Sequence, residues 1–207
     1  MMKRIFLVSY CTKRDLLFLK KEFRDGDLVV GVDQGLDRLL ENSLIPHYVI
    51  GDFDSLKLPW NKIPDQCQVI RLNSKKDISD LEYALNYFQN YPSPKEIIIV
   101  NNLQGRIDHI LSVVHLLEQR KNTWIENAKQ KVFLATKSFQ GPVRKNCHLS
   151  LIPLSKKVKG IQTSGLEYSL NNEHLVRNMA RGLSNKCVDK KVGINFIEGK
   201  LLVIIEK

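Results

Sequence analysis

The segment YVIGDFDS (residues 48–55) joins a short apolar run to two aspartates, and this pattern recurs through the first two thirds of the chain. Other apolar runs rich in branched residues lie at 5–8, 28–32, 69–72, 97–100 and 132–135. Because the runs are continuous rather than alternating, we interpret them as strands of a parallel sheet covered on both faces. Stripes at helical spacing, beginning at Leu16, Leu36, Leu81 and Ile110, lie between them. This alternation predicts an α/β layer.

The pattern changes near Phe139. Beyond it, short strand candidates at 149–154, 160–163, 194–197 and 201–205 are separated by turn residues such as Gly165. This pattern is typical of a small all-β unit. We therefore expect an N-terminal α/β domain at residues 1–138 and a C-terminal β domain at 139–207, with Gly141-Pro142 as the linking turn.

The chain has a formal net charge of +10, from 32 Lys and Arg against 22 Asp and Glu. Such a surplus fits a nucleic-acid binder or an enzyme with a polyanionic substrate. No aromatic RNA-binding motif or Cys/His finger accompanies it, so no nucleic-acid partner is expected. The four cysteines form no CxxC pair, which favours reduced cytosolic thiols. No apolar run approaches the roughly 20 residues of a membrane span, so we expect no membrane association and a cytoplasmic location.

Aspartates follow successive predicted strands: Asp33 ends the second run, Asp52 and Asp54 follow the third, Asp77 and Asp80 the fourth, and Asp108 the fifth. Ligands of open parallel sheets bind outside the carboxyl ends of the strands, so these carboxylates are expected to converge. Crowded carboxylates need a cation or a shared proton, and Mg²⁺ prefers carboxylates together with substrate phosphates. In an extended segment, Asp52 and Asp54 would face the same side. The cluster therefore favours a magnesium site.

A structural interpretation competes for each aspartate, because Asp is common in turns and helix caps. Ser79 and Glu82 form a capping-box pattern around Asp80, which would then only complement the helix dipole. Three glycines, Gly35, Gly51 and Gly105, would allow a close backbone approach to phosphate. The chain has no GxGxxG, no Walker-type P-loop, no HExxH and no GxSxG. Their absence argues against the corresponding dinucleotide, P-loop, metalloprotease and serine-hydrolase sites.

Taken together, DQGLDR (33–38), GDFDS (51–55), KDISD (76–80), GRIDH (105–109), SGLEYSL (164–170) and GLSN (182–185) resemble the thiamine pyrophosphokinase family. The resemblance implies an N-terminal α/β domain, a C-terminal β-sandwich, and a homodimer whose active site lies between subunits. It also implies that ATP and Mg²⁺ are used to pyrophosphorylate thiamine. The thiamine hydroxyl would attack the β-phosphorus in line and AMP would leave, which requires mainly alignment and charge neutralisation.

The resemblance also implies residue roles. Asp52, Asp54 and Asp80 would hold Mg²⁺ and the ATP phosphates, and Asp33 and Asp108 would complete the acidic rim. Lys76 and Arg106 would bind phosphate oxygens. The remaining nucleotide-binding positions would be Gly35, Asp37, Asp77, Gly105 and His109. The thiamine pocket would be lined by Thr163, Ser164, Tyr168, Ser184 and Asn185.

The chain departs from the family pattern around its first acidic motif. Gln34, Leu36 and Asp37 stand in a segment that is usually Asp-Gly-Gly-Ala-Asn, and Gln104 replaces a usual glycine. These departures leave open a related Mg²⁺-dependent pyrophosphokinase with another alcohol acceptor. A non-catalytic regulator that binds thiamine or a nucleotide is the other alternative.

Overall fold

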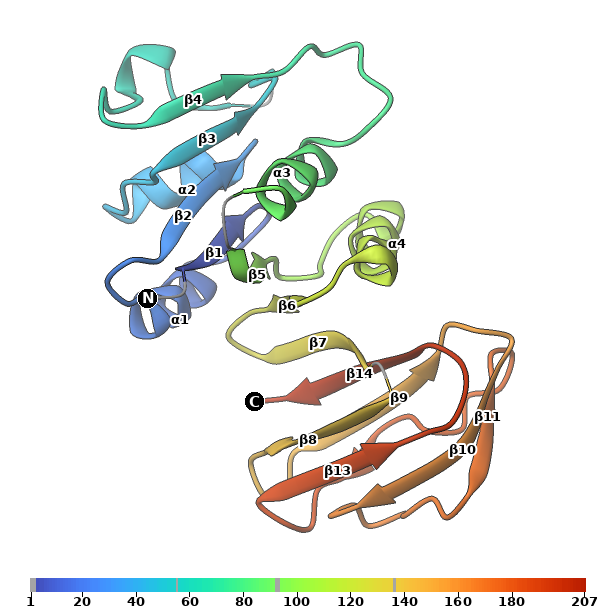
Figure 1. Cartoon of the computed structure of the whole chain (residues 1–207). Helices are drawn as coiled ribbons and strands as arrows, with labels where there is room; N and C mark the ends of the chain where they lie inside the picture. The colour runs from blue at the N-terminus through green and yellow to red at the C-terminus, as the bar shows by residue number, and fades with distance from the viewer. Residues whose placement is uncertain (1–2, 55, 92–93, 136) are drawn as a thin grey trace. The chain divides into compact units, whose positions relative to one another are not determined.

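The computed structural model describes residues 3–54, 56–91, 94–135 and 137–207. Ser55, the last residue of the GDFDS motif, therefore lies outside the described residues. The chain forms two compact units, at residues 1–128 and 129–207 (Figure 1). Among the described residues, no helix combines the length and the apolar character that a bilayer-spanning segment needs.

The first unit is an α/β layer, as the alternating pattern predicts. Its strands are β1 (Lys3–Val8), β2 (Leu28–Val32), β3 (Tyr48–Gly51), β4 (Gln68–Arg71), β5 (Pro94–Val100) and β6 (Thr123–Glu126). Its helices are α1 (Lys13–Glu22), α2 (Gly35–Glu41), α3 (Asp80–Gln89) and α4 (Ile107–His115), with short 3₁₀ segments at Trp60–Lys62 and Leu116–Gln119. Within the unit the strands are parallel, in the order β6-β5-β1-β2-β3-β4.

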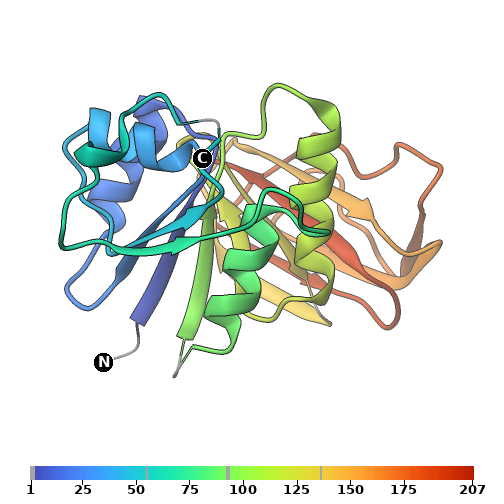
Figure 2. The same ribbon diagram turned by 90° about the horizontal axis from the view of Figure 1, so that it is seen from above.

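Helices cover both faces of this sheet (Figure 2). Leu16 and Leu19 of α1 pack in one cluster with Phe6 and Val29 of the sheet. On β3, Val49 packs with Leu36 of α2. Successive strand residues face opposite sides. The neighbouring Tyr48 accordingly meets α3, where its ring lies edge-on to Phe88 at 5.2 Å between centroids.

The strand order creates a switch point beside β1. The chain steps outward from β1 through β2 and β3 to β4, then returns to place β5 on the other side of β1 and β6 beyond it. The loops that leave β1 and β5 therefore diverge at the carboxyl ends of two neighbouring strands. In open α/β sheets this is where ligands bind.

Three details of the first unit differ from the prediction. The 69–72 run is not covered on both faces: β4 is an edge strand, and Val69 is 40% exposed. Strand β6 was missed because its sequence TWIE alternates instead of forming an apolar run. The stripe that begins at Ile110 is only partly core, since Leu117 is buried whereas Leu111 is 53% exposed.

The second unit is all-β and contains two antiparallel layers. Its strands are β7 (Gln130–Ala135), β8 (Ser138–Pro142), β9 (His148–Pro153), β10 (Lys157–Ser164), β11 (Glu173–Val176), β12 (Asn185–Lys186), β13 (Lys191–Asn195) and β14 (Leu201–Glu206). Within the unit, one layer has the order β12-β9-β14-β7 and the other β11-β10-β13-β8. Buried side chains from both layers, among them Leu149, Ile161, Ile194 and Val203, form one core. The expected α/β fold with a C-terminal β-sandwich is confirmed.

Two expectations near the junction are wrong. The 132–135 run, assigned to the parallel sheet, is β7 and pairs antiparallel with β14. The turn expected at Gly141-Pro142 is strand instead: both residues lie in β8, with Gly141 opposite Val192 of β13. Pro142 ends that strand, where a missing N–H donor is tolerated.

Candidate active site

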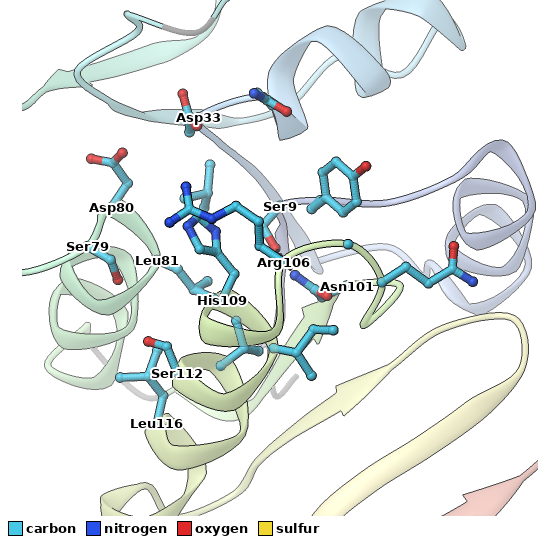
Figure 3. A pocket seen from close by; sticks show the side chains of 17 residues that line it. Ser9, Asp33, Ser79, Asp80, Leu81, Asn101, Arg106, His109, Ser112 and Leu116 are labelled. Carbon is cyan, nitrogen blue, oxygen red and sulfur yellow. Dashed lines mark hydrogen bonds between the residues drawn. The ribbon is translucent and has the colours of Figure 1, made fainter.

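A pocket of about 530 Å³ lies at the switch point of the parallel sheet. Its lining comes from the carboxyl ends of β1, β2 and β5, the start of α3 and the length of α4, and includes Ser9, Asp33, Asp80, Asn101, Arg106 and His109. Figure 3 shows Asp33 and Asp80 projecting from different elements, with Arg106 and His109 on the α4 side. The volume falls within the range of small-molecule sites.

The turn after β2 is fixed by close backbone contacts. Asp33 has a left-handed φ of 47° and donates its N–H to the carbonyl of Ile50, at 2.9 Å. A Cβ on Gly35 would lie 1.9 Å from the carbonyl oxygen of Val8, so α2 can begin against the end of β1 only with glycine there. Gly35 therefore serves packing, and it does not line the pocket.

The first turn of α3 confirms the capping role of Ser79. Its Oγ accepts a hydrogen bond from the N–H of Glu82, at 3.2 Å, and Asp80 is the first helical residue. Asp80 nevertheless also lies in a carboxylate cluster. The structural and functional interpretations of this aspartate therefore do not exclude each other.

Carboxylate oxygens of Asp33, Asp52 and Asp80 lie within 4.8 Å of one another. These residues come from the ends of β2 and β3 and the start of α3, so the predicted convergence is confirmed for them. Lys76 neutralises part of the cluster: its Nζ lies 3.1 Å from Oδ2 of Asp52 and 2.9 Å from Oδ1 of Asp80. The three side chains of these pairs are between 13% and 18% exposed.

The cluster shifts the ionisation of its members in different directions. Burial raises the pKa of Asp80, and the carboxylates of Asp52 and Asp33 add to this rise while Lys76 opposes it. Burial would also raise the pKa of Asp52, but hydrogen bonds from Lys76 and the Asp54 N–H outweigh burial, so this pKa is lowered. The pKa of Lys76 is raised, because its two carboxylate partners outweigh the effect of burial. One ammonium thus only partly offsets three acidic groups.

The donor set fits a hard divalent cation. Among the residues that the structure describes, Oδ1 of Asp80 is buried, and the polar contact shown for it is the Lys76 ammonium, at 2.9 Å. Convergent carboxylate oxygens with spare coordination capacity, beside a pocket large enough for phosphates, match what Mg²⁺ requires.

Other predicted residues are placed differently. Asp54 and Asp77 are exposed, and neither belongs to the cluster formed by the described carboxylates. The segment at 52–54 is not extended as expected, because Phe53 has a left-handed φ of 63°. Asp37 is buried, and both of its oxygens accept backbone N–H groups.

Three of the four predicted residues near α4 line the pocket. Arg106, Gly105 and His109 line it, and Gly105 has a φ of 92°, which favours glycine. Asp108 is exposed and pairs with Arg106, at 2.6 Å, but it neither lines the pocket nor joins the cluster of described carboxylates, so the convergence expected for it is not observed. This contact lowers the pKa of Asp108 and raises that of Arg106.

Sequence reasoning missed the base of the pocket. Ser9 and Asn101 directly follow β1 and β5, and the amide of Asn101 donates to Oγ of Ser9, at 3.0 Å. Asn101 is 8% exposed and also accepts the N–H of Leu103. Both residues directly follow apolar runs, as the aspartates do. The same positional rule therefore points to them once neutral polar side chains are included.

In the second unit, the predicted thiamine residues form two groups. Thr163 and Ser164 line a polar pocket of about 480 Å³ together with Gln162, Ser169, Leu170, Asn171 and Asn195. Asn185 instead binds the backbone of Tyr168 twice: its Oδ1 accepts the N–H at 3.1 Å, and its amide donates to the carbonyl at 2.7 Å. Ser184, with a φ of 52°, adjoins this second group. Tyr168 is left 70% exposed.

Comparisons with known proteins agree with the site and with both units. Residues 19–127 match the family model described as "Thiamin pyrophosphokinase, catalytic domain", and residues 136–201 match "Thiamin pyrophosphokinase, vitamin B1 binding domain". Thiamine pyrophosphokinase of Bacillus subtilis (strain 168) is 28% identical over 211 residues, covering 98% of each chain.

Solved structures show the same fold. The thiamin pyrophosphokinase structure from Geobacillus thermodenitrificans has a TM-score of 0.86 and 26% identity, and the match covers 99% of this chain and 97% of the other. Yeast thiamin pyrophosphokinase, at 17% identity and a TM-score of 0.75, shares the fold over 99% of this chain and 86% of its own. Since the catalytic-domain model alone matches more than half of the sequence, the chain belongs to the thiamine pyrophosphokinase family.

Proposed function

We propose that this chain transfers the pyrophosphoryl group of ATP to the hydroxyl of thiamine, giving thiamine diphosphate and AMP. The observation that carries the proposal is the cluster of Asp33, Asp52, Asp80 and Lys76 beside the switch-point pocket. Phosphoryl-group transfer requires mainly alignment and neutralisation of charge on phosphate oxygens. A site that joins carboxylates for a cation to a lysine for phosphate supplies both.

We propose Mg²⁺ as the cation, held by Asp33, Asp52 and Asp80, with Asp54 as a further ligand. When bound, it would supply positive charge to the phosphate oxygens and orient the pyrophosphoryl group. Lys76 would lend its ammonium to the same oxygens. Arg106, at the start of α4 and 72% exposed, would bind phosphate from the other side of the pocket. A carboxylate, Asp80 or Asp54, would accept the proton of the thiamine hydroxyl.

Residues 1–138 would bind ATP and residues 139–207 thiamine. In the second unit, Thr163, Ser164, Tyr168, Ser184 and Asn185 would hold the thiamine rings. The polar side chains offer hydrogen bonds, and the exposed Tyr168 ring offers an apolar face to the cationic thiazolium. We also propose a cytoplasmic location, which the four free, buried cysteines support.

The test is AMP release from ATP and Mg²⁺, measured with and without thiamine. Release that depends on thiamine and accompanies thiamine diphosphate is the expected result. Asp52→Asn should abolish it, whereas Asp65→Asn, an exposed aspartate between β3 and β4, should not. Turnover of another hydroxymethyl heterocycle in place of thiamine would identify a related pyrophosphokinase. Thiamine binding without any AMP would identify a regulator.

We further propose that the enzyme is a homodimer whose active site is completed between subunits. Mixing Asp52→Asn with Asn185→Ala, each of which we expect to be inactive alone, tests this directly. If each site takes residues from two chains, subunit exchange should restore about a quarter of the wild-type activity, because half of the dimers are mixed and each holds one intact site. No recovery in a sample shown to be dimeric and exchanged would contradict a shared site.

A further inference from the structure

Asp37 is a buried carboxylate whose two oxygens are both used by the backbone of a distant loop. It lies in the first turn of α2 and is 4% exposed. Its Oδ2 accepts the N–H of Lys57 at 2.9 Å, and its Oδ1 accepts the N–H of Leu58 at 3.2 Å. Hydrogen bonds to a charged acceptor are among the stronger ones in proteins. A buried carboxylate that accepts two consecutive N–H groups anchors the segment that carries them.

The anchored segment begins at the carboxylate cluster. Lys57 and Leu58 follow Asp52 and Asp54 by a few residues, and the described residues here, 52–54 and 56–58, are in neither helix nor strand. α2 itself starts directly after Asp33, and the lack of a Cβ at Gly35 lets it sit against β1. Asp37 therefore connects α2, which follows Asp33, to the backbone of residues 57 and 58, which follows Asp52.

Resting on the proposed function, we propose that Asp37 is a positioning residue for the cation site. It holds residues 56–58, and through them the preceding residues 52–54, so that Asp52 and Asp54 are presented to the cation and phosphates, and it does so without touching the nucleotide. Phe53 and Leu56 also pack against the buried cluster of Leu36, Val49 and Cys67. The hydrogen bonds of Asp37 add a polar attachment to this apolar one. Residues that orient metal ligands from behind are a general feature of metal sites.

Two measurements distinguish a positioning role from a general loss of stability: the rate of tryptic cleavage after Lys57 and the Mg²⁺ dependence of activity. In Asp37→Ala the loop loses both bonds, so trypsin should cleave after Lys57 at least about tenfold faster, relative to cleavage after the exposed Lys145 of the second unit. The Mg²⁺ concentration for half-maximal activity should rise about tenfold or more. The KM for thiamine should not change. Asp37→Asn keeps one acceptor oxygen and should give an intermediate result in both assays.

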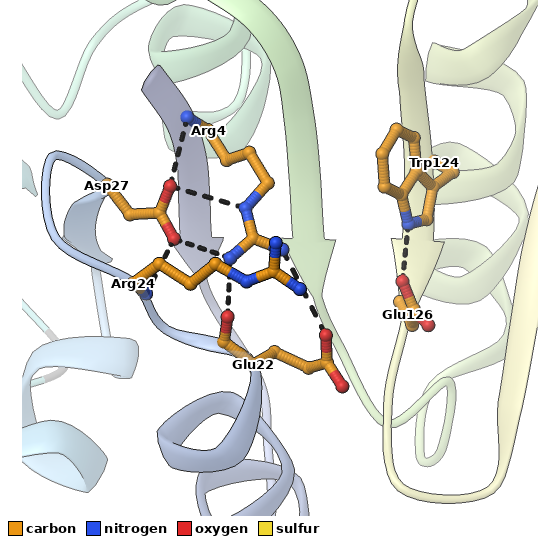
Figure 4. A network of polar contacts seen from close by, with 6 residues as sticks. All are labelled: Arg4, Glu22, Arg24, Asp27, Trp124 and Glu126. Carbon is orange, nitrogen blue, oxygen red and sulfur yellow. Dashed lines mark hydrogen bonds and ion pairs between the residues drawn. The ribbon is translucent and has the colours of Figure 1, made fainter. Parts of the chain in front are cut away.

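Asp27→Asn is the matched control. Asp27 is equally buried, at 4%, but it lies before β2 at the opposite end of the sheet, where it pairs with Arg4 (Figure 4). This variant should lower the melting temperature without changing loop cleavage or Mg²⁺ dependence. It thereby shows what a purely structural loss in the same unit looks like.

Folded Asp37→Ala and Asp37→Asn proteins with wild-type cleavage after Lys57 and wild-type Mg²⁺ dependence would overturn the proposal. Equal changes in the Asp27 control would overturn it as well. The cleavage assay needs no turnover, so failure of the proposed function would show separately, as wild-type protein that makes no AMP while its loop still responds to substitution at Asp37.

Discussion

Removal of the Lys76 ammonium should destabilise the folded protein, because the carboxylates of Asp33, Asp52 and Asp80 would then repel one another without a compensating charge. The substitution Lys76→Met keeps the aliphatic stem and deletes only the charge. The oxygens of this cluster lie within 4.8 Å of one another, and at that limit two like unit charges repel by about 3.5 kcal/mol at an effective dielectric constant of 20. Breaking one partner out of a buried ion pair typically costs about 3–5 kcal/mol. Because these side chains keep some exposure, at 13–18%, we expect destabilisation near the lower end, about 3 kcal/mol.

That loss should appear as a drop in melting temperature of about 6–12 °C without divalent cations, measured by circular dichroism. Mg²⁺ should then raise the melting temperature more in Lys76→Met than in wild type, because the cation no longer competes with an ammonium. Lys159→Met is the control: Lys159 pairs with Glu198 at 2.7 Å on the surface, where ion pairs contribute little. An unchanged melting temperature, or equal Mg²⁺ effects in the variant and wild type, would refute the assignment of Lys76 as the charge that holds the cluster together.

Three further substitutions test other parts of the structure. Gly35→Ala should destabilise the protein by about 3 kcal/mol in urea titrations, because its Cβ would collide with the Val8 carbonyl; an unchanged midpoint would contradict this packing. Tyr168→Ala should raise the KM for thiamine about tenfold and leave that for ATP unchanged, and a matching rise for ATP would argue against a thiamine-specific role. Hydrogen bonding to His148 lowers the pKa of Glu206 below its ordinary 4.5, so stability should fall as the pH drops through the folded-state value. In Glu206→Gln this acid-induced loss should be smaller, and an identical pH profile would exclude that contribution.

The fold was largely predictable, because the local signals agreed with the tertiary structure. Continuous apolar runs marked β1, β2, β3 and β5, each largely or wholly buried on both faces. The signal failed at the sheet margins. Strand β4, QVIR, carries two branched apolar residues but lies at an exposed edge, and β6 has an alternating sequence. Exposure at an edge depends on which strands lie beside it, and this is a property of the topology rather than of the local sequence.

The sequence predicted which aspartates lie at the strand ends, but it did not predict the side-chain contacts within the site. Asp33, Asp52 and Asp80 converge because parallel strands place their carboxyl ends at one edge. The insertion of Lys76 between two of them depends on the approach of the loop before α3, and no residue spacing encodes that approach. The position of Asp37 was equally hidden, since its partners are backbone N–H groups twenty residues away. Side-chain contacts of this kind follow from the packed structure alone.

The left-handed backbone at the carboxyl edge limits how far this protein can be stabilised by engineering. Asp33, Phe53 and Leu103 adopt φ values of 47°, 63° and 52°, each at a strain of order 1 kcal/mol that glycine would relieve. Leu103→Gly would remove such strain without deleting a carboxylate. At Asp33 the same exchange would delete a member of the cluster, and at Phe53 it would delete an apolar anchor of the loop. Selection for heat resistance alone would therefore favour replacing Asp33, which removes strain together with a crowded carboxylate, and only selection that also demands turnover would retain it.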